Sequence, residues 1–353
     1  MTVAPPPSPL PALGVVVVAY GSADVILDCL ESLVASTGVR LAIVVVDNAS
    51  PDGTPDLVRR WASGAPHAPP PLPFPLLPSR GPRPLRASGE SPLPEEGHGV
   101  TLIEAGGNGG FAAGVNLGLA RLAAEPALDR FWILNPDSVV PPGTARALAT
   151  HPAPPGGFAL LGGRVLYLDD PDRIQIDGGT IDRRTGVTGN LGLGQSHRAT
   201  PPPDPARVDF VTGASMVASR AFHERAGPLP EHYFLYYEEV DWALRRGGLP
   251  LLHCPEALVF HRAGTAIGSP APGRPASPFS LYFKHRGRLR FVRRHLPLAL
   301  PGAWAYSLAK AAQLALGGHR AEARAVLLGS AGRPPPPAVR ARLSPEALRR
   351  LGA

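Results

Sequence analysis

The stretch VVVVAYGSADVILDCLESLVASTGVRLAIVVVD, residues 15–47, decides the fold. Its two ends are runs of valine and other apolar residues, the composition of strands that are covered on both faces in a parallel sheet. Between them, residues 24–34 place apolar side chains at helical spacing. A strand, a helix and a second strand in so short a span form a βαβ unit with a right-handed crossover. The chain therefore begins as an α/β domain.

The same alternation of elements continues beyond this unit. Apolar periodicity predicts helices at 54–62 and 111–124 and strands at 100–104, 131–134 and 160–168. A glycine-rich loop with hairpin signals follows at 174–197, and residues 209–219 lead into another helix. We therefore expect an α/β fold with a mostly parallel mixed sheet flanked by helices.

Proline is concentrated in two places. The chain has 353 residues, of which 44% are hydrophobic and 18% charged, and this composition argues against wholesale disorder. Residues 1–13 form a proline-rich leader. In residues 62–99, 11 of 38 are proline and no apolar period survives, so we expect a disordered or loosely packed insertion.

Positive charge is concentrated near the C-terminus. The formal net charge is +7, but residues 281–353 hold 14 Lys and Arg against 2 Asp and Glu, whereas the first 280 residues carry a net negative charge. Residues 271–353 are therefore predicted to be a basic helical extension that follows the α/β domain at 14–270. Such a segment suits an anionic membrane surface, an acidic partner or nucleic acid. A solvated basic helix is the alternative.

We expect neither export nor a membrane span. The first 23 residues carry no side-chain charge, but they lack the basic start of a signal peptide and contain helix-breaking prolines. Residues 296–309 are uncharged but too short for a bilayer core of about 30 Å. The two cysteines, Cys29 and Cys254, lie far apart in sequence, and each is flanked by apolar residues that indicate the interior of a helix or strand. We therefore expect neither a disulfide scaffold nor a cysteine-based zinc site. We expect a cytoplasmic protein.

Common nucleotide motifs are missing. A dinucleotide-binding fold needs Gly-x-Gly-x-x-Gly after its first strand, but residues 19–24 read AYGSAD, and the chain has no P-loop. Polar residues nevertheless follow three predicted strands, at the sheet edge where open α/β sheets bind ligands. Among them, Asp137 suits a hard cation, or it is simply a turn residue.

Two later features could carry chemistry. Glu238, Glu239 and Asp241 follow an aromatic run. Three carboxylates so close together repel one another, so either the fold gains a function from holding them together or they form an acidic first helical turn. His261 ends an apolar strand, where it is either a ligand or a satisfied structural histidine.

Seven motifs occur in the order of one family and cover residues 14 to about 265. The sequence resembles a family-2 glycosyltransferase of the GT-A fold, in the rhamnosyltransferase-like branch. The motifs are Ala19-Tyr20, VVVDNAS at 44–50, NGGFAAGVN at 108–116, LNPD at 134–137, GASM at 213–216, FLYYEEVD at 234–241 and HRAG at 261–264.

The resemblance implies an inverting transfer from a nucleoside-diphosphate sugar, dTDP-rhamnose or a UDP-sugar, to a hydroxyl of a glycan or lipid-linked acceptor in cell-surface polysaccharide synthesis. Mg²⁺ or Mn²⁺ would be held by Asp137 and His261. The family's commoner Asp-x-Asp motif is replaced here by Asn135-Pro136-Asp137, which removes one charge.

The resemblance also assigns the remaining site residues. Glu239 is the expected general base, Glu238 orients the acceptor and Asp241 anchors the following helix. Because Glu stands where Asp is usual, Glu238 and Asp241 stay open as alternative bases. The residues expected to bind the nucleotide sugar are Ala19, Tyr20, Asp47, Asn108, Gly109, Gly110 and Asn135.

Residues 281–294 alternate aromatic and aliphatic residues with cations, the composition of an interfacial helix. With a lipid-linked acceptor, this predicts peripheral attachment to the inner face of the plasma membrane. Two alternatives stay open. A sugar nucleotidyltransferase would carry a basic glycine-rich loop after the first strand. A nucleic-acid-binding protein would carry a recognition motif in its tail. We find neither feature and expect no nucleic-acid partner.

Overall fold

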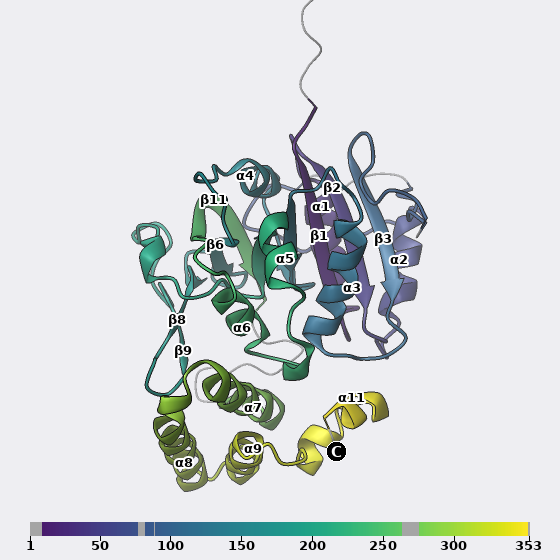
Figure 1. Ribbon diagram of the computed structural model, residues 1–353. Helices are drawn as coiled ribbons and strands as arrows, with labels where there is room; N and C mark the ends of the chain where they lie inside the picture. The colour runs from purple at the N-terminus through teal and green to yellow at the C-terminus, as the bar shows by residue number, and fades with distance from the viewer. Residues whose placement is uncertain (1–8, 77–81, 88, 263–274, 352–353) are drawn as a thin grey trace, which may run out of the picture.

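The computed structural model describes residues 9–76, 82–87, 89–262 and 275–351. Its main feature is a nine-stranded mixed sheet in the order β3-β2-β1-β4-β10-β6-β11-β5, with β7 paired to β6 (Figure 1). β8 and β9 form a separate hairpin. The strands are β1 (Ala12–Ala19), β2 (Arg40–Asp47), β3 (His98–Glu104), β4 (Arg130–Leu134), β5 (Ser138–Val139), β6 (Leu160–Tyr167), β7 (Ile174–Ile176), β8 (Gly179–Ile181), β9 (Thr188–Asn190), β10 (Ser215–Ser219) and β11 (Leu251–His261).

Helices cover both faces of this sheet and continue beyond it. β3, β2, β1 and β4 are mutually parallel, as the βαβ pattern predicts, and β10 runs antiparallel to β4. The helices are α1 (Ile26–Val34), α2 (Thr54–Ala62), α3 (Phe111–Ala123), α4 (Thr144–Thr150), α5 (Arg220–Ala226), α6 (Glu238–Leu244), α7 (Pro278–His295), α8 (Leu300–Leu316), α9 (Arg320–Ser330), α10 (Pro337–Arg340) and α11 (Pro345–Arg350).

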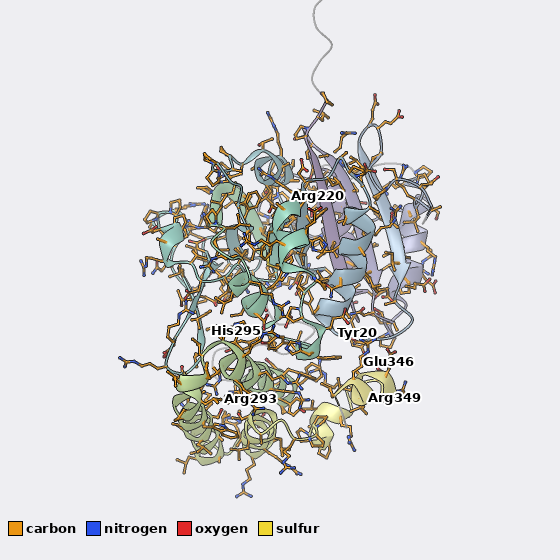
Figure 2. All side chains as sticks on the ribbon, in the orientation of Figure 1. Tyr20, Arg220, Arg293, His295, Glu346 and Arg349 are labelled. Atoms are coloured by element: carbon orange, nitrogen blue, oxygen red, sulfur yellow. The ribbon has the colours of Figure 1, made fainter. Side chains whose placement is uncertain are left out.

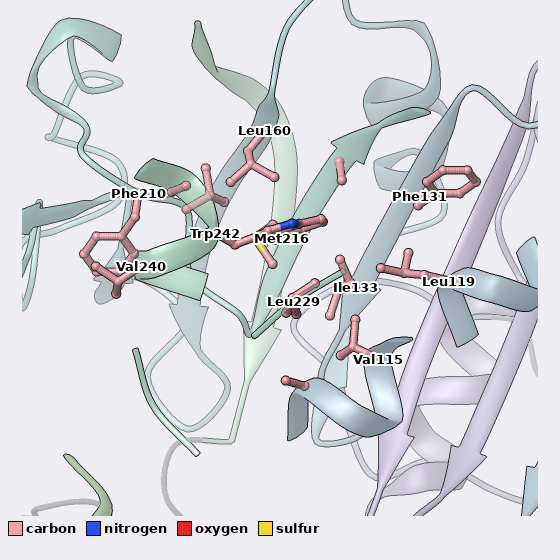
Figure 3. Packing of buried hydrophobic residues seen from close by; sticks show 14 of the residues in the cluster. Val115, Leu119, Phe131, Ile133, Leu160, Phe210, Met216, Leu229, Val240 and Trp242 are labelled. Atoms are coloured by element: carbon pink, nitrogen blue, oxygen red, sulfur yellow. The ribbon is translucent and has the colours of Figure 1, made fainter. Parts of the chain in front are cut away.

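The core lies on the two faces of the sheet. β1 shows the division, because Val16 and Val18 pack on the α3 side whereas Val15 and Val17 pack on the α1 side. Figure 3 shows the first side, where Val115 and Leu119 of α3 lie in one buried cluster with Ile133, Met216 and Trp242. α3 approaches β1 closely through its glycines: a Cβ on Gly118 would lie 2.5 Å from a methyl carbon of Val16.

The two proline-rich segments differ. Residues 1–8 of the predicted leader lie outside the described residues, and β1 already begins at Ala12, inside its predicted bounds. The described part of the insertion contains no helix or strand before His98. Its backbone is nevertheless tied to the domain, because the amides of Arg83 and Arg86 donate to the carbonyls of Ala62 and Val100. This part is therefore more ordered than we expected. Residues 77–81 and 88 are not described.

The C-terminal helices lie beyond the end of the sheet at which β1 terminates (Figure 1). α7 packs against α8 and α9, and Leu281, Tyr282, Phe283, Leu289, Phe291 and Val292 are all buried. The prediction that the apolar side chains of residues 281–294 face a membrane is therefore wrong. Their aromatic and aliphatic pattern satisfies a protein core, and the periodicity of a helix does not identify what covers it. In the described chain, no helix combines the length and hydropathy needed to span a bilayer.

Candidate active site

The carboxyl edge of the sheet brings together the first residues that we predicted to bind the nucleotide sugar. The parallel register sets Ala19 opposite Asp47, so Tyr20 and Asn48 follow at the same level. Tyr20 is exposed at this edge (Figure 2). Asp47 is buried and accepts from the amide of Ser50 through Oδ2, but its Oδ1 has no hydrogen-bond partner among the described residues. An unsatisfied buried carboxylate oxygen at a ligand-binding edge fits a hydroxyl or amide donor from a ligand.

The glycine turn after β3 is held in place by two asparagines. Asn108 accepts from the amide of Gly110 through Oδ1, and Asn48 donates to the carbonyl of Gly110. The side-chain oxygen of Asn108, which we expected to face the nucleotide, therefore shapes the turn. Gly110 has a φ of 91°, and a Cβ there would lie 2.4 Å from the carbonyl oxygen of Phe234. Only glycine fits this contact between the turn and the aromatic run.

Asp137 and His261, predicted to share a metal, lie side by side. The two-residue strand β5 follows Asp137 directly and pairs antiparallel with the end of β11, with Ser138 opposite His261. The amide of Arg262 also donates to the carbonyl of Asp137. As a result, Oδ1 of Asp137 lies 3.0 Å from Nε2 of His261. Ala263 and Gly264 of the same motif lie outside the described residues.

The hydrogen bonds of His261 show which ring nitrogen carries the proton and which one faces Asp137 with a lone pair. Nδ1 lies 2.8 Å from Oε1 of Gln175, which can only accept, so Nδ1 carries the proton. Nε2 is then an acceptor and lies 3.2 Å from the side-chain amide nitrogen of Asn135. Nε2 of His261 and Oδ1 of Asp137 are then two acceptor atoms only 3.0 Å apart, and they repel each other. A second ring proton or a cation between them would supply the positive charge that stabilises this arrangement.

A divalent ion fits this pair. Ligand atoms at right angles, each about 2.1 Å from an octahedral ion, are about 3.0 Å apart. A carboxylate with an imidazole suits Mn²⁺ or Mg²⁺. Gln175, on β7, fixes the ring in the way that outer partners commonly orient histidine ligands. We did not predict Gln175 from its residue type, although its place between two buried isoleucines indicates a side chain turned away from the core.

The three clustered carboxylates have different surroundings. Asp241 is fully buried and is held by Tyr233, Arg245 and His295 at 2.9, 2.7 and 2.9 Å. Burial raises the pKa of Asp241, but the hydrogen bonds from His295 and Tyr233 and the charge of Arg245 outweigh it and lower the pKa overall. These contacts tie α6 to α7, and they leave Asp241 a weaker candidate for the base than Glu238 or Glu239.

Glu238 and Glu239 behave differently from Asp241. Each has a buried Oε2 atom without a hydrogen-bond partner in the described chain. Burial raises the pKa of Glu239, and burial together with the charge of Glu239 raises the pKa of Glu238 well above the ordinary value. Glu239 also lines a pocket of about 120 Å³. An unpartnered carboxylate with a raised pKa in a pocket is a suitable general base.

The backbone before this pair is strained. Phe234, Tyr236 and Tyr237 all have positive φ values, of 68°, 66° and 74°. Side chains other than glycine adopt this region at a cost of about 1–3 kcal/mol each. The segment is held from one side by the glycine turn, and from the other by α7, where a Cβ on Gly287 would lie 2.6 Å from the carbonyl oxygen of Tyr236. Such strain is typical of functional sites.

The pocket also contains a residue from the C-terminal helices. Lys284 of α7 lines it together with Glu239, Tyr236 and Tyr237. Lys284 is the single exposed residue in the otherwise buried stretch 281–289. The sequence analysis missed its role because we assigned this helix to a membrane surface. The helical extension therefore contributes to the wall of the candidate site.

A second group of potential metal ligands lies between β11 and the end of α4. His151, Cys254 and Glu256 offer ligand atoms within 4.8 Å of one another. Burial and a hydrogen bond to Glu256 raise the pKa of the Cys254 thiol to about 11. The thiol is therefore protonated at neutral pH, and it is a soft donor, unlike the oxygen-rich sites that Mg²⁺ and Mn²⁺ prefer.

Comparisons with known proteins agree with this arrangement. The family described as Glycosyl transferase family 2 matches residues 14–70. The N-acetylglucosaminyl-diphospho-decaprenol L-rhamnosyltransferase of Mycobacterium tuberculosis is 24% identical over 299 residues, which cover 77% of this chain and 81% of that protein. The low-salt glycan biosynthesis hexosyltransferase Agl10 of Haloferax volcanii is 29% identical over 149 residues, 41% of this chain and only 46% of the relative.

Solved structures support the same fold. The mannosyltransferase PcManGT from Pyrobaculum calidifontis, in complex with GDP-Man and Mn²⁺, superimposes with a TM-score of 0.50 at 18% identity, covering 94% of this chain and 90% of that one. GalNAc-T7 with UDP, GalNAc and Mn²⁺ also gives a TM-score of 0.50 at 13% identity, covering 81% of this chain and 48% of that one. The predicted GT-A fold, a mixed sheet flanked by helices, is thereby confirmed.

Proposed function

The chain belongs to family 2 of the glycosyltransferases, in its rhamnosyltransferase-like branch, and from this premise we propose that it is an inverting, metal-dependent transferase. The donor is a nucleoside-diphosphate sugar, dTDP-rhamnose or a UDP-sugar, and the acceptor is a hydroxyl of a glycan or lipid-linked sugar in cell-surface polysaccharide synthesis. The observation that carries the proposal is the pairing of Asp137 with His261 at the carboxyl edge of a sheet.

The donor side is formed by the sheet edge. Tyr20 is free to flank the base, and the unpartnered Oδ1 of Asp47 can accept a hydrogen bond from the base or ribose. The glycine turn lets the backbone approach the donor without a Cβ. Asp137 and His261 would hold Mg²⁺ or Mn²⁺, which when bound supplies positive charge beside the departing diphosphate. Asn135 keeps its side chain on His261 and completes this side of the site.

The acceptor side is formed by the carboxylate pocket. An acceptor hydroxyl has a pKa far above 7 and needs a base that removes its proton as it attacks. Glu239 can take this proton, since it lines the pocket and its Oε2 atom has no other partner among the described residues. Glu238 lies beside it and orients the acceptor. Direct attack by the hydroxyl inverts the anomeric carbon and needs no covalent glycosyl-enzyme.

A thermal-shift panel tests this function. Sugar nucleotides such as dTDP-rhamnose, UDP-N-acetylglucosamine and GDP-mannose are added with and without Mn²⁺, and one donor should stabilise the protein more with the ion present. Glu239→Gln should abolish transfer but keep the shift, whereas Asp137→Asn should lose its Mn²⁺-dependent part. Glu224→Gln, an exposed glutamate on α5, is the matched control. Loss of both transfer and shift in Glu239→Gln would make Glu239 structural.

We also propose that the protein binds the anionic inner face of the plasma membrane peripherally, through α8 rather than α7. Leu308 and Leu316 on α8 and Leu298 just before it are 56%, 90% and 96% exposed. The sequence has no Asp or Glu from residue 257 to 321. Arg293 and Arg294 lie shortly before α8, and Arg320 lies shortly after it. Exposed leucines bordered by cations suit an anionic lipid surface.

Liposome sedimentation tests the membrane proposal. The protein should pellet with anionic vesicles at low salt and much less with neutral ones. Replacing Leu308 and Leu316 by serine should release it, whereas the same change at exposed Leu193, outside these helices, should have no effect. Equal sedimentation of all three proteins would exclude α8 as the contact surface.

A further inference from the structure

The pocket at Glu239 contains a cation whose charge has no partner. The ammonium group of Lys284 makes no hydrogen bond or ion pair with any residue that the structure describes. The Oε2 atom of Glu239, in the same pocket, is also unpartnered. Opposite charges that line one pocket without pairing leave room for a ligand with both a hydroxyl for the carboxylate and an anionic group for the lysine.

A second lysine, Lys310, belongs to α8, which packs against α7. Although Lys284 keeps contact with solvent, the protein that surrounds it in the pocket lowers its pKa by desolvation. The negative charge of Glu239 opposes this shift, and the charges of Arg288 and Lys310 lower the pKa further. The packing of the two helices agrees with this: Nδ1 of His285, the neighbour of Lys284, lies 3.3 Å from Oγ of Ser307, which is one helical turn before Lys310 on α8. Arg288 is already engaged, with Ser307 and the carbonyls of Thr185 and Ala303. Lys310 donates one hydrogen bond, to Oε1 of the exposed Gln313 at 3.0 Å, and keeps further ammonium hydrogens. Both lysines can therefore bind a shared anion, which would also relieve their repulsion.

The surface beyond Lys310 is apolar. Lys310 shares α8 with Leu308 and Leu316, which are strongly exposed. From the sheet outward, the chain therefore presents a carboxylate pocket on α6, a pair of lysines on α7 and α8, and an apolar helix face. In Figure 1, α6, α7 and α8 follow one another in this order away from the sheet.

We propose that Lys284 and Lys310 bind the diphosphate of a lipid-linked acceptor. The order of the three surfaces matches the order of groups in a sugar diphosphate lipid: the sugar hydroxyl at Glu239, the diphosphate at the lysines and the lipid along α8. This inference rests on the proposed function and adds its acceptor-binding residues. A diphosphate accepts several charge-assisted hydrogen bonds, so each lysine contributes substantially to affinity.

Equilibrium binding of decyl diphosphate to the full chain tests the inference. The titration contains EDTA, so that a metal ion in the donor site cannot hold the probe. Lys284→Met and Lys310→Met should each weaken binding by about 10-fold or more, the value of one hydrogen bond between charged groups. Lys284→Arg should largely restore it. Arg225→Met, which removes an exposed charge from α5, should change affinity by less than about twofold.

The outcomes separate this inference from the proposed function. If both lysine variants, shown to be folded by their melting curves, bind decyl diphosphate as the wild type does, the lysines are not its site and the inference fails. Displacement of the probe by a nucleoside diphosphate would place it on the donor side and would overturn the inference as well. The donor and Mn²⁺ thermal shift is measured on the same variants and should stay intact, since it reports the donor site alone.

Discussion

Replacing Gln175 by alanine should weaken Mn²⁺ binding by about 10-fold to 100-fold. Gln175 is not among the residues expected to contact the nucleotide sugar. Its Oε1 atom accepts a hydrogen bond from Nδ1 of His261 at 2.8 Å. Without this bond the imidazole ring is free to turn, and Nε2 loses its fixed place 3.0 Å from Asp137. The predicted factor corresponds to about 1.4–2.7 kcal/mol, the range expected for one hydrogen bond that strengthens when a cation polarises the ring.

The assay is a Mn²⁺ titration with saturating nucleoside diphosphate, with free Mn²⁺ read by electron paramagnetic resonance. Gln175→Glu should bind as tightly as the wild type or more tightly, because a carboxylate makes the histidine a stronger ligand. Gln195→Ala, the same change at an exposed glutamine of the neighbouring loop, is the control. Wild-type affinity in Gln175→Ala, with loss in His261→Ala, would refute the orienting role. Wild-type affinity in His261→Ala would refute the metal pair itself.

Three further predictions concern stability and pH. Asp241→Asn should destabilise the fold by about 3 kcal/mol at neutral pH, because it breaks a buried ionic network; chemical denaturation measures this. The pKa of Asp241 is lowered in the folded state. Its contribution to stability is therefore complete above the unfolded pKa of about 3.9 and is lost as pH falls through the folded pKa. The difference in the free energy of unfolding between wild type and variant should disappear over the same pH range. Gly287→Ala should lower both the melting temperature and transfer, because its Cβ meets the carbonyl of Tyr236, whereas Gly143→Ala, in open space, should not. In the pH profile of kcat/KM, the apparent pKa on the acid side should lie above the ordinary glutamate value of about 4.3, because the pKa of Glu239 is raised and the base must be ionised. An apparent pKa at or below that value would exclude Glu239 as the base.

Residue patterns predicted the sheet and its polar edge well. The valine runs and the helical spacing between them located β1, α1 and β2, because a strand buried on both faces has an unmistakable composition. The meeting of Asp137 with His261 was expected from the family resemblance alone. It depends on β5, which has two residues and no pattern of its own.

The missed residues depend on tertiary contacts. Lys284 lies on a helix whose alternating aromatic and cationic residues fit a membrane surface as well as a protein core, and the packing of α7 against α9 decides between them. Asn108 has the residue type of a ligand contact, but its oxygen is used by its own turn. Short-range hydrogen bonds of this kind compete with ligands and cannot be seen in spacing alone.

The strained segment from Phe234 to Tyr237 links the two halves of the site. Its one end accepts a hydrogen bond from the amide of Phe111, next to the glycine turn, and its other end leads directly into Glu238 and Glu239. A movement of the turn when a nucleotide arrives would therefore shift the carboxylates through a few peptide bonds. Such a mechanical link favours a compulsory order of substrate addition, in which the sugar nucleotide enters first and prepares the place for its acceptor.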